Sequence, residues 1–495
     1  MTDQSWRGTW WPAGEHDTAC PGTLRYAEDG RLRLELIGGF NTEVRTPRPD
    51  GNGYSVSIES REIPIIHGVS GNERFTLLGN IDTHTSGLGF FDGEIVEQDW
   101  SANRALRGIH LQSLGEQVFT HGYLQLEGLL QWSNTSALDL THVMEPGKVG
   151  GERRASTHEE LERTAVFGDM KIGLRVRRSD FSLKNRPVSN RRFLESVEWA
   201  TLKFELPAPV AYDAFDRVAK DLQDLLSLSA YAPCGALSRS LMYETSETHP
   251  GSRRGENEVE VMGRQIYRTT TGEDKSESSH RLFVFTLAEM DFPDIVPKWL
   301  DLKDRVRTGC EILFGLRYIG IGYVGTRLLG VASAAESVHT GLCSASTPMP
   351  KIEYRKLKRK LLDALEDEPD EIKEFVKNGL RNNPTYNDRV LELASIPDAE
   401  AVDRLLTDRS RWASMLKNAR NDLAHANERS SRDPEATPAF WLLEVTYALL
   451  CLVLMSELGI GAEAQRSVLG RPRVNWASFQ FKKFLHAKNE MDSPE

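Results

Sequence analysis

Hydrophobic positions follow two different periods along the chain, and the change comes after about residue 285. Before it, short segments alternate apolar and polar residues with period two, as at 32–36 (LRLEL) and 54–58 (YSVSI). This alternation, with turn residues close by, predicts half-buried strands. Many short strands of this kind indicate a sandwich or a curled sheet, with one helix at 213–226 packed on it. Further strands are expected at 75–78, 90–96, 106–111, 123–130, 170–176, 197–206 and 259–267.

After Pro293 the apolar positions recur at the spacing of amphipathic helices. One helix start is marked by Pro369 followed by Asp370 and Glu371, since acidic residues favour the positive end of the helix dipole. The predicted fold class is α+β and multidomain. A β-rich, sandwich-like region at 1–285, which could divide again near 145–165, precedes an all-α helical bundle at 290–490. Helices are expected at 294–316, 327–341, 353–366, 370–380, 399–406, 409–427 and 437–458.

Length and charge narrow the classes of protein. A chain of 495 residues is too long for one hydrophobic core, so two or three domains are expected. Its formal net charge of −11 excludes a protein that coats nucleic acid through its overall field. A nucleic-acid site would therefore have to be a local basic patch.

Cysteine usage and hydrophobic runs predict a cytoplasmic protein without a membrane span. The five cysteines form no Cys-x-x-Cys pair, which is typical of reduced thiols rather than of a disulfide framework or a zinc site. The amino terminus lacks the pattern of a signal peptide. The longest apolar run, 439–455, contains Glu444 and Thr446 and is short for a membrane span, so a buried bundle helix is expected. The histidines show no metal-ligand spacing, and neither a metal nor a cofactor is expected.

The segment 420–425 (RNDLAH) carries the strongest candidate chemistry. Arginine offers a permanent, fork-shaped cation for a phosphate, and histidine can exchange a proton near neutral pH. Such a pair could cleave RNA without a metal. His425 would take the proton of the ribose 2′-hydroxyl, or in its protonated form donate to the leaving 5′-oxygen. Arg420 would hold the non-bridging phosphate oxygens, and Asn421 could orient the substrate or the imidazole.

The context of this pair matters more than its spacing. An arginine followed five or six positions later by histidine also occurs at 61–67, 104–110 and 153–158. Only the arginine at 420 is followed directly by asparagine and lies in a strongly helical region. The alternative interpretation of 420–425 is a surface arginine and a hydrogen-bonded histidine at the end of a bundle helix.

Helical geometry places Arg420 and His425 in different directions. Five residues at about 100° each put the two side chains about 140° apart. Either the helix ends or distorts within the motif, or a second surface completes the site. A two-fold dimer would supply that surface, because each copy brings the same arginine and histidine to one seam.

Other candidate residues are weaker. Asp422 could take part only if it pairs with arginine or histidine, since a carboxylate repels phosphate. Glu336 and His339, three apart on a predicted helix, could support the site from a neighbouring helix, or be an ordinary core or surface pair. The basic segment 351–360 could follow an RNA backbone or be a solvated helix face. Its candidate RNA-binding residues are Arg355, Lys356, Lys358, Arg359 and Lys360.

The chain resembles the HEPN superfamily through the segment 420–427 (RNDLAHAN), because that superfamily has an Arg-polar-x(3 to 5)-His motif. The longer layout resembles the ApeA-like anti-phage proteins, in which a β-rich domain precedes an ApeA-type HEPN domain. The segments at 8–12 (GTWWP), 75–78 (FTLL) and 126–132 (LEGLLQW) contribute to this resemblance.

The resemblance implies a metal-independent endoribonuclease that is active as a HEPN homodimer. Arg420 and His425 would be catalytic, with Asn421 as the polar position. It also implies abortive infection, in which RNA, tRNA being one candidate, is cut after a phage is sensed. A phage-encoded protein could be the trigger, and the β-rich region would then be the sensor or regulator.

Two other functions stay open. The first is a non-catalytic HEPN module that binds nucleic acid or a nucleotide, in which the basic segment 351–360 would matter more than His425. The second is a ligand-binding β-sandwich with a structural helical tail. The leading hypothesis remains the HEPN endoribonuclease.

Overall fold

A computed structural model forms two compact units. The first comprises Met1–Leu226, Cys234–Arg281 and Thr286–Pro297, and the second comprises Ser227–Pro233, Leu282–Phe285 and Lys298–Glu495. The first unit is mainly β and the second is helical, which confirms the expected fold class. The structure describes residues 3–40, 42–47, 54–59, 62–87, 95–143, 152–186, 191–244, 256–263, 283–319, 322–343, 349–424 and 436–492.

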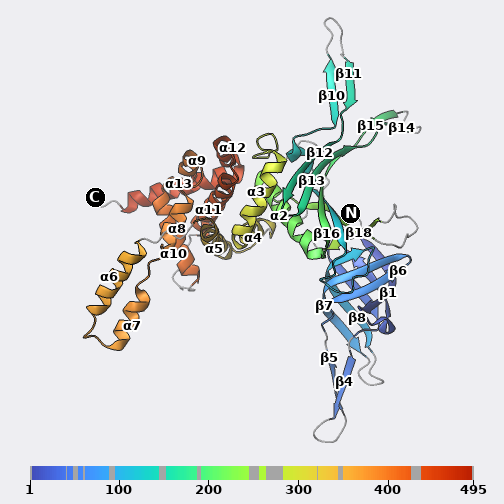
Figure 1. Ribbon diagram of the computed structural model, residues 1–495, viewed down its shortest axis with the longest axis horizontal. Helices are drawn as coiled ribbons and strands as arrows, with labels where there is room; N and C mark the ends of the chain where they lie inside the picture. The colour runs from blue at the N-terminus through green and yellow to red at the C-terminus, as the bar shows by residue number, and fades with distance from the viewer. Residues whose placement is uncertain are drawn as a thin grey trace. The chain divides into compact units, whose positions relative to one another are not determined.

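Six strands of the first unit close into a barrel, which is coloured blue to cyan in Figure 1. Their order is β8-β3-β2-β1-β6-β7, and β7 pairs back onto β8. All the pairings within the barrel are antiparallel. The curled form of the expected sheet is therefore the one found. The six strands are β1 (Gln4–Pro12), β2 (Cys20–Tyr26), β3 (Leu32–Ile37), β6 (Ile65–Ser70), β7 (Glu73–Gly87) and β8 (Ile95–Arg107).

Aromatic side chains fill the barrel. Trp10, Phe75 and Trp100 are almost fully buried, and the rings of Trp10 and Phe75 lie 5.7 Å apart. Trp10 lies opposite Gly68 in the pairing of β1 with β6. A Cβ atom at residue 68 would collide with the Trp10 indole, so glycine is needed where the ring crosses the strand.

The sheet continues beyond the barrel from β8 through β18, β17, β9, β16 and β13 to β12. Helix α2 (Tyr212–Ala230) packs on this part of the sheet, where its Phe215 ring lies 6.5 Å from Phe204. Asp216 of this helix also accepts a hydrogen bond from Arg239 at 3.1 Å, which confirms the expected helix on the sheet. The strands are β9 (Phe119–Leu126), β12 (Leu161–Phe167), β13 (Met170–Arg178), β16 (Glu198–Val210), β17 (Ala236–Glu244) and β18 (Glu256–Gly263).

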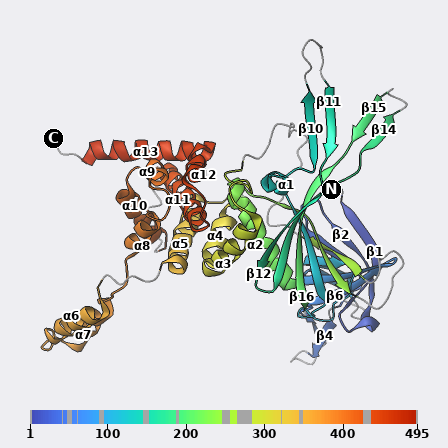
Figure 2. The same ribbon diagram turned by 45° about the horizontal axis from the view of Figure 1, so that its top comes forward.

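Three further pairs of strands form hairpins that pair only with themselves, two of which are clear in Figure 2. They are β4 (Thr42–Pro47) with β5 (Tyr54–Glu59), β10 (Leu138–Val143) with β11 (Glu152–Thr157), and β14 (Ser182–Arg186) with β15 (Arg191–Glu195). The first unit also contains the short helices η1 (His16–Thr18) and α1 (Leu129–Ser133).

Two expected strands end earlier than predicted, each near a glycine in the left-handed region. The strand expected at 106–111 stops at Arg107, and Gly108 has a φ of +122°. The strand expected at 123–130 stops at Leu126, and Gly128, with a φ of 78°, is the N-cap of α1. Such backbone angles are open to glycine and interrupt an extended strand.

The helical unit confirms most of the expected helices, but the one expected at 294–316 is two helices that meet at Val306. Helices α8, α12 and α13 were not expected. The helices are α3 (Phe292–Arg305), α4 (Arg307–Tyr318), α5 (Val324–Leu342), α6 (Lys351–Asp363), α7 (Asp370–Gly379), α8 (Tyr386–Leu393), α9 (Ala399–Leu406), α10 (Arg409–Ala424), α11 (Ala436–Glu457), α12 (Ala462–Ser467), η4 (Val468–Gly470) and α13 (Pro472–Asp492).

Helix α11 lies at the core of the helical unit. Its segment Pro438–Glu457 is long and apolar enough to cross a membrane by length and composition, but 78% of its most apolar 18-residue window is buried inside the protein. The buried carboxylate of Glu444 accepts hydrogen bonds from Arg317 and from Arg473, each at 2.8 Å. A charged group paired in this way can be accommodated in a protein core, which fits the expected bundle helix.

Candidate functional site

Arg420 lies in the last turn of the described part of α10. This helix is described as Arg409–Ala424, so Arg420, Asn421 and Asp422 fall within it, and His425 lies outside the described residues. The end of α10 packs against the start of α5, where a Cβ atom on Gly325 would come within 3.1 Å of the Leu423 side chain.

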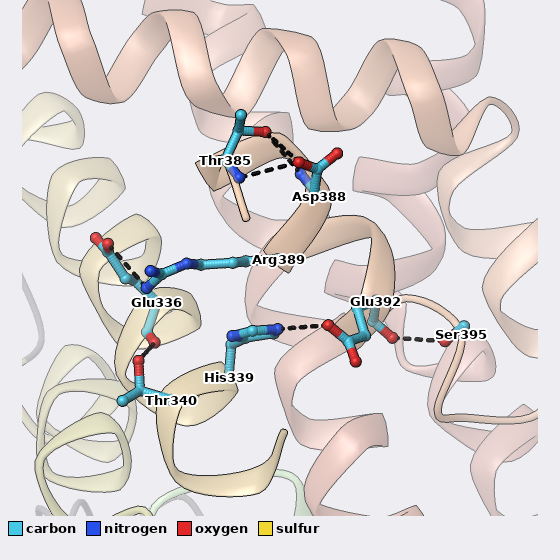
Figure 3. Close-up of polar contacts among 8 residues, drawn as sticks. All are labelled: Glu336, His339, Thr340, Thr385, Asp388, Arg389, Glu392 and Ser395. Atoms are coloured by element: carbon cyan, nitrogen blue, oxygen red, sulfur yellow. Dashed lines mark hydrogen bonds and ion pairs between the residues drawn. The ribbon is translucent and has the colours of Figure 1, made fainter. Parts of the chain in front are cut away.

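A carboxylate from α5 holds the Arg420 guanidinium. Nη2 of Arg420 donates to Oε2 of Glu336 at 2.9 Å. The other oxygen, Oε1, accepts from Nη1 of Arg389 at 3.4 Å. Figure 3 shows Arg389 reaching from α8 toward Glu336. One carboxylate therefore faces two guanidinium groups, and this group of three carries a formal charge of +1.

Tyr386 supports Arg420 from another side. The guanidinium carbon of Arg420 lies 5.0 Å from the centre of the Tyr386 ring, within the range of a cation–π contact. The hydroxyl of Tyr386 donates to the carbonyl of Ala332 on α5 at 3.0 Å. Burial raises the pKa of Tyr386 well above its ordinary value, so the ring stays neutral. Helix α8 begins at this residue with a capping box formed by Thr385 and Asp388 (Figure 3).

The position of the Arg420 guanidinium allows it to bind an anion. A guanidinium has five N–H donors. Among the described residues, Arg420 makes one hydrogen bond, and its partner is Glu336. Its side chain is 35% exposed, so the remaining donors can reach a ligand from solvent. The ion pair and the ring fix the direction of the guanidinium in advance, which is the preorganisation that charge stabilisation in a transition state requires.

One helical turn further along α5, a second polar cluster also joins α5 to α8. Nε2 of buried His339 lies 2.8 Å from Oε2 of Glu392 (Figure 3). The ligand atoms of His339, Glu392 and Cys343 all lie within 4.8 Å of one another. Burial and the neighbouring Glu392 carboxylate raise the pKa of the Cys343 thiol to about 11. Among the described residues of this unit, these three side chains could together hold a metal.

The other predicted residues make no described contact with these two clusters. Asn421 is exposed and Asp422 is half-buried at the end of α10. The basic helix α6 is held to α7 and the residues after it, for example by a 2.6 Å hydrogen bond from Tyr354 to the Leu380 carbonyl. Lys358 is half-buried, and Arg355, Lys356, Arg359 and Lys360 are exposed. Among the described contacts, none joins an α6 cation to Arg420, Glu336 or Arg389.

Of the three predicted supporting residues, Glu336 contacts Arg420, His339 contacts Glu392, and Asp422 is half-buried at the end of α10. Sequence reasoning missed Tyr386, Arg389 and Glu392 because α8 was not predicted. A signal was present, since a threonine three residues before an aspartate marks a helix start. The spacing of His339 and Cys343, four apart on one helix face, was also overlooked.

Replacing Glu336 with glutamine is expected to lower the rate of the RNA cleavage predicted from the sequence roughly tenfold. Glutamine keeps the shape but replaces the ion pair with Arg420 by a hydrogen bond to a neutral amide, a loss of about 1.4 kcal/mol. The measurement is kcat and KM on one RNA, together with thermal unfolding to show that the fold is kept. Glu374→Gln is the matched control, because Glu374 forms an exposed ion pair with Lys377 on α7. An unchanged or faster rate for Glu336→Gln would contradict a positioning role.

Comparison with known families identifies the class of protein. Residues 329–464 match the Apea-like HEPN family, so the helical region is an HEPN domain, a class that is typically ribonucleolytic and is consistent with a defence system. Residues 5–299 match the family ApeA N-terminal domain 1. This second match covers more than half of the 495 residues, and the chain therefore belongs to the ApeA-like HEPN proteins, which confirms the resemblance. No curated protein and no solved structure matches the chain.

Proposed function

We propose that this protein is a metal-independent HEPN endoribonuclease in which Arg420 and His425 carry out the cleavage. The observation that carries the proposal is the state of Arg420, whose guanidinium is partly exposed and fixed by Glu336 and Tyr386. Among the described residues Arg420 donates one hydrogen bond, to Glu336, so its other donors can reach a phosphate, five residues before a histidine within an HEPN domain.

The proposed reaction is an attack of the ribose 2′-oxygen on the adjacent phosphorus. The bond from phosphorus to the 5′-oxygen breaks as the new bond from the 2′-oxygen forms. His425 moves the proton, either by accepting it from the 2′-hydroxyl or, when protonated, by donating to the leaving 5′-oxygen. Arg420 stabilises the charge on the non-bridging oxygens, while Asn421 orients the substrate or the imidazole.

The biological role that we propose is abortive infection in the cytoplasm. RNA, with tRNA as one candidate, would be cut after a phage-encoded protein is sensed. The β-rich first unit would supply the sensor, and a homodimer of the HEPN domain would complete the cleft. Membership of the ApeA-like HEPN proteins supports this role.

The ends of the cleaved RNA test the chemistry. Attack by the 2′-oxygen is expected to leave a 2′,3′-cyclic phosphate on one product and a 5′-hydroxyl on the other, as read by mass spectrometry. Since no metal takes part in these steps, adding EDTA at the start of the assay is expected to change the rate by less than about twofold. A 3′-hydroxyl with a 5′-phosphate, or immediate loss of activity in EDTA, would contradict this mechanism.

A further inference from the structure

We propose that His339, Cys343 and Glu392 form a binding site for a zinc-class divalent metal ion. The proposal is independent of the cleavage chemistry proposed above. It starts from the convergence of an imidazole, a thiol and a carboxylate, whose ligand atoms lie within 4.8 Å of one another. These are the three kinds of side chain that bind zinc in proteins.

The two helices present these ligands in a suitable way. His339 lies in the last turn of α5, Cys343 is the C-cap residue of that helix, and the spacing of four places both on the same face. Glu392, in the last turn of α8, supplies the third ligand from the facing helix. His339 is 4% exposed, so its imidazole is already out of water, and Nε2 points toward the carboxylate (Figure 3).

The donor set selects the kind of metal. A thiolate and an imidazole favour zinc and similar transition metals, whereas Mg²⁺ and Ca²⁺ prefer oxygen ligands. Three protein ligands leave the fourth position of a tetrahedral site for water. Binding would replace the thiol proton of Cys343, which leaves to solvent as the sulfur–metal bond forms.

The alternative interpretation of the cluster is a hydrogen-bond network without a metal. A simple hydrogen-bond network would need only the His339–Glu392 pair. The Cys343 thiol also hydrogen-bonds the Glu392 carboxylate, so the same three ligand atoms that meet in this network are the ones that a metal ion would join.

A metal at this position would fasten α5 to α8 one turn from the Glu336–Arg389–Arg420 cluster. The same face of α5 carries Glu336, and the same face of α8 carries Arg389. By joining α5 to α8, the ion would keep the two helices that position Arg420 in register.

The test is metal content and cobalt spectroscopy on the full chain. Purified protein is expected to contain about one zinc per chain by elemental analysis. After removal of zinc, Co²⁺ is expected to give the visible and near-ultraviolet bands of tetrahedral cobalt with a thiolate ligand. Cys343→Ser is expected to lose the thiolate band, and Cys343→Ser and Glu392→Gln are expected to weaken zinc binding at least about tenfold.

Cys20→Ser is the matched control, because Cys20 is also a half-buried free cysteine and lies in the other unit. It is expected to bind Co²⁺ as the wild type does, and Mg²⁺ is expected to bind no more tightly to the wild type than to Cys343→Ser. Wild-type protein that binds neither Zn²⁺ nor Co²⁺, or Cys343→Ser with an unchanged cobalt spectrum, would overturn the site. If the variants fail to fold, titration of the metal-free wild type with Zn²⁺ tests the site. Its thermal unfolding temperature is expected to rise, and an unchanged temperature would overturn the site.

Arg420→Ala separates the two proposals. It removes the proposed phosphate ligand and leaves His339, Cys343 and Glu392 in place. It is expected to lose RNA cleavage but to keep the cobalt bands. The cleavage assay therefore tests the ribonuclease proposal, and the cobalt spectrum tests the metal site separately.

Discussion

Arg420→Ala is expected to lower the rate of RNA cleavage by about 10³-fold, the usual cost of removing a group that stabilises transition-state charge. The fold should survive, because Glu336 keeps its contact with Arg389 at 3.4 Å after Arg420 is removed. His425→Ala should lower the rate by about 10² to 10⁴-fold through the loss of proton transfer. The measurement is single-turnover cleavage of one RNA, with circular dichroism and thermal unfolding to check the fold.

Two further variants make this result specific. Arg404→Ala on α9 removes another arginine that is paired with a carboxylate, Glu400, and is expected to cleave like the wild type. Arg420→Lys keeps the charge but not the fork of donors, and is expected to recover only part of the activity. If Arg420→Ala and His425→Ala both fold and cleave normally, the catalytic proposal fails. Phage restriction without cleavage would then favour a non-catalytic HEPN module.

The two hydrophobic periods were sufficient to predict the order of the β-rich and helical regions, because each period reports which faces are buried locally. The closure of the barrel could not be predicted in this way. It depends on β7 pairing with β8 as well as with β6, which no local pattern encodes. The break between α3 and α4 at Val306 was also missed, because neither proline nor glycine marks the position.

The site was predictable only in part. Arg420 could be singled out from its neighbours in sequence, but its partners depend on long-range packing. Glu336 lies 84 positions away, and the contact with Tyr386 requires α8 to pack beside α10. The sequence offered Glu336 and His339 as a joint support. In the structure, these two residues belong to different clusters. Residues three apart lie on the same face of a helix but about one turn apart along its axis.

Mixing the two inactive variants is expected to restore activity if the cleft is shared between two copies. Arg420 is fixed on the side of α10 that faces Glu336 and Tyr386. A regular helix would direct the residue five positions later about 140° away, which favours a histidine supplied by a second copy. A mixed dimer of Arg420→Ala with His425→Ala then has one site with both groups intact and one with neither.

Purification through two different tags keeps only the mixed dimers, and each of these has one of its two sites intact, so about half of wild-type activity should return. Arg420→Ala alone is expected to cleave about 10³-fold more slowly than the wild type. The mixed dimer is therefore expected to cleave several hundred-fold faster than that variant. The experiment is co-expression with two different tags, purification through both, and cleavage of the same RNA. Each variant carried on both tags is the control. If the doubly tagged dimer forms and stays inactive, Arg420 and His425 must act within one copy. The end of α10 would then have to turn His425 back toward the Arg420 guanidinium.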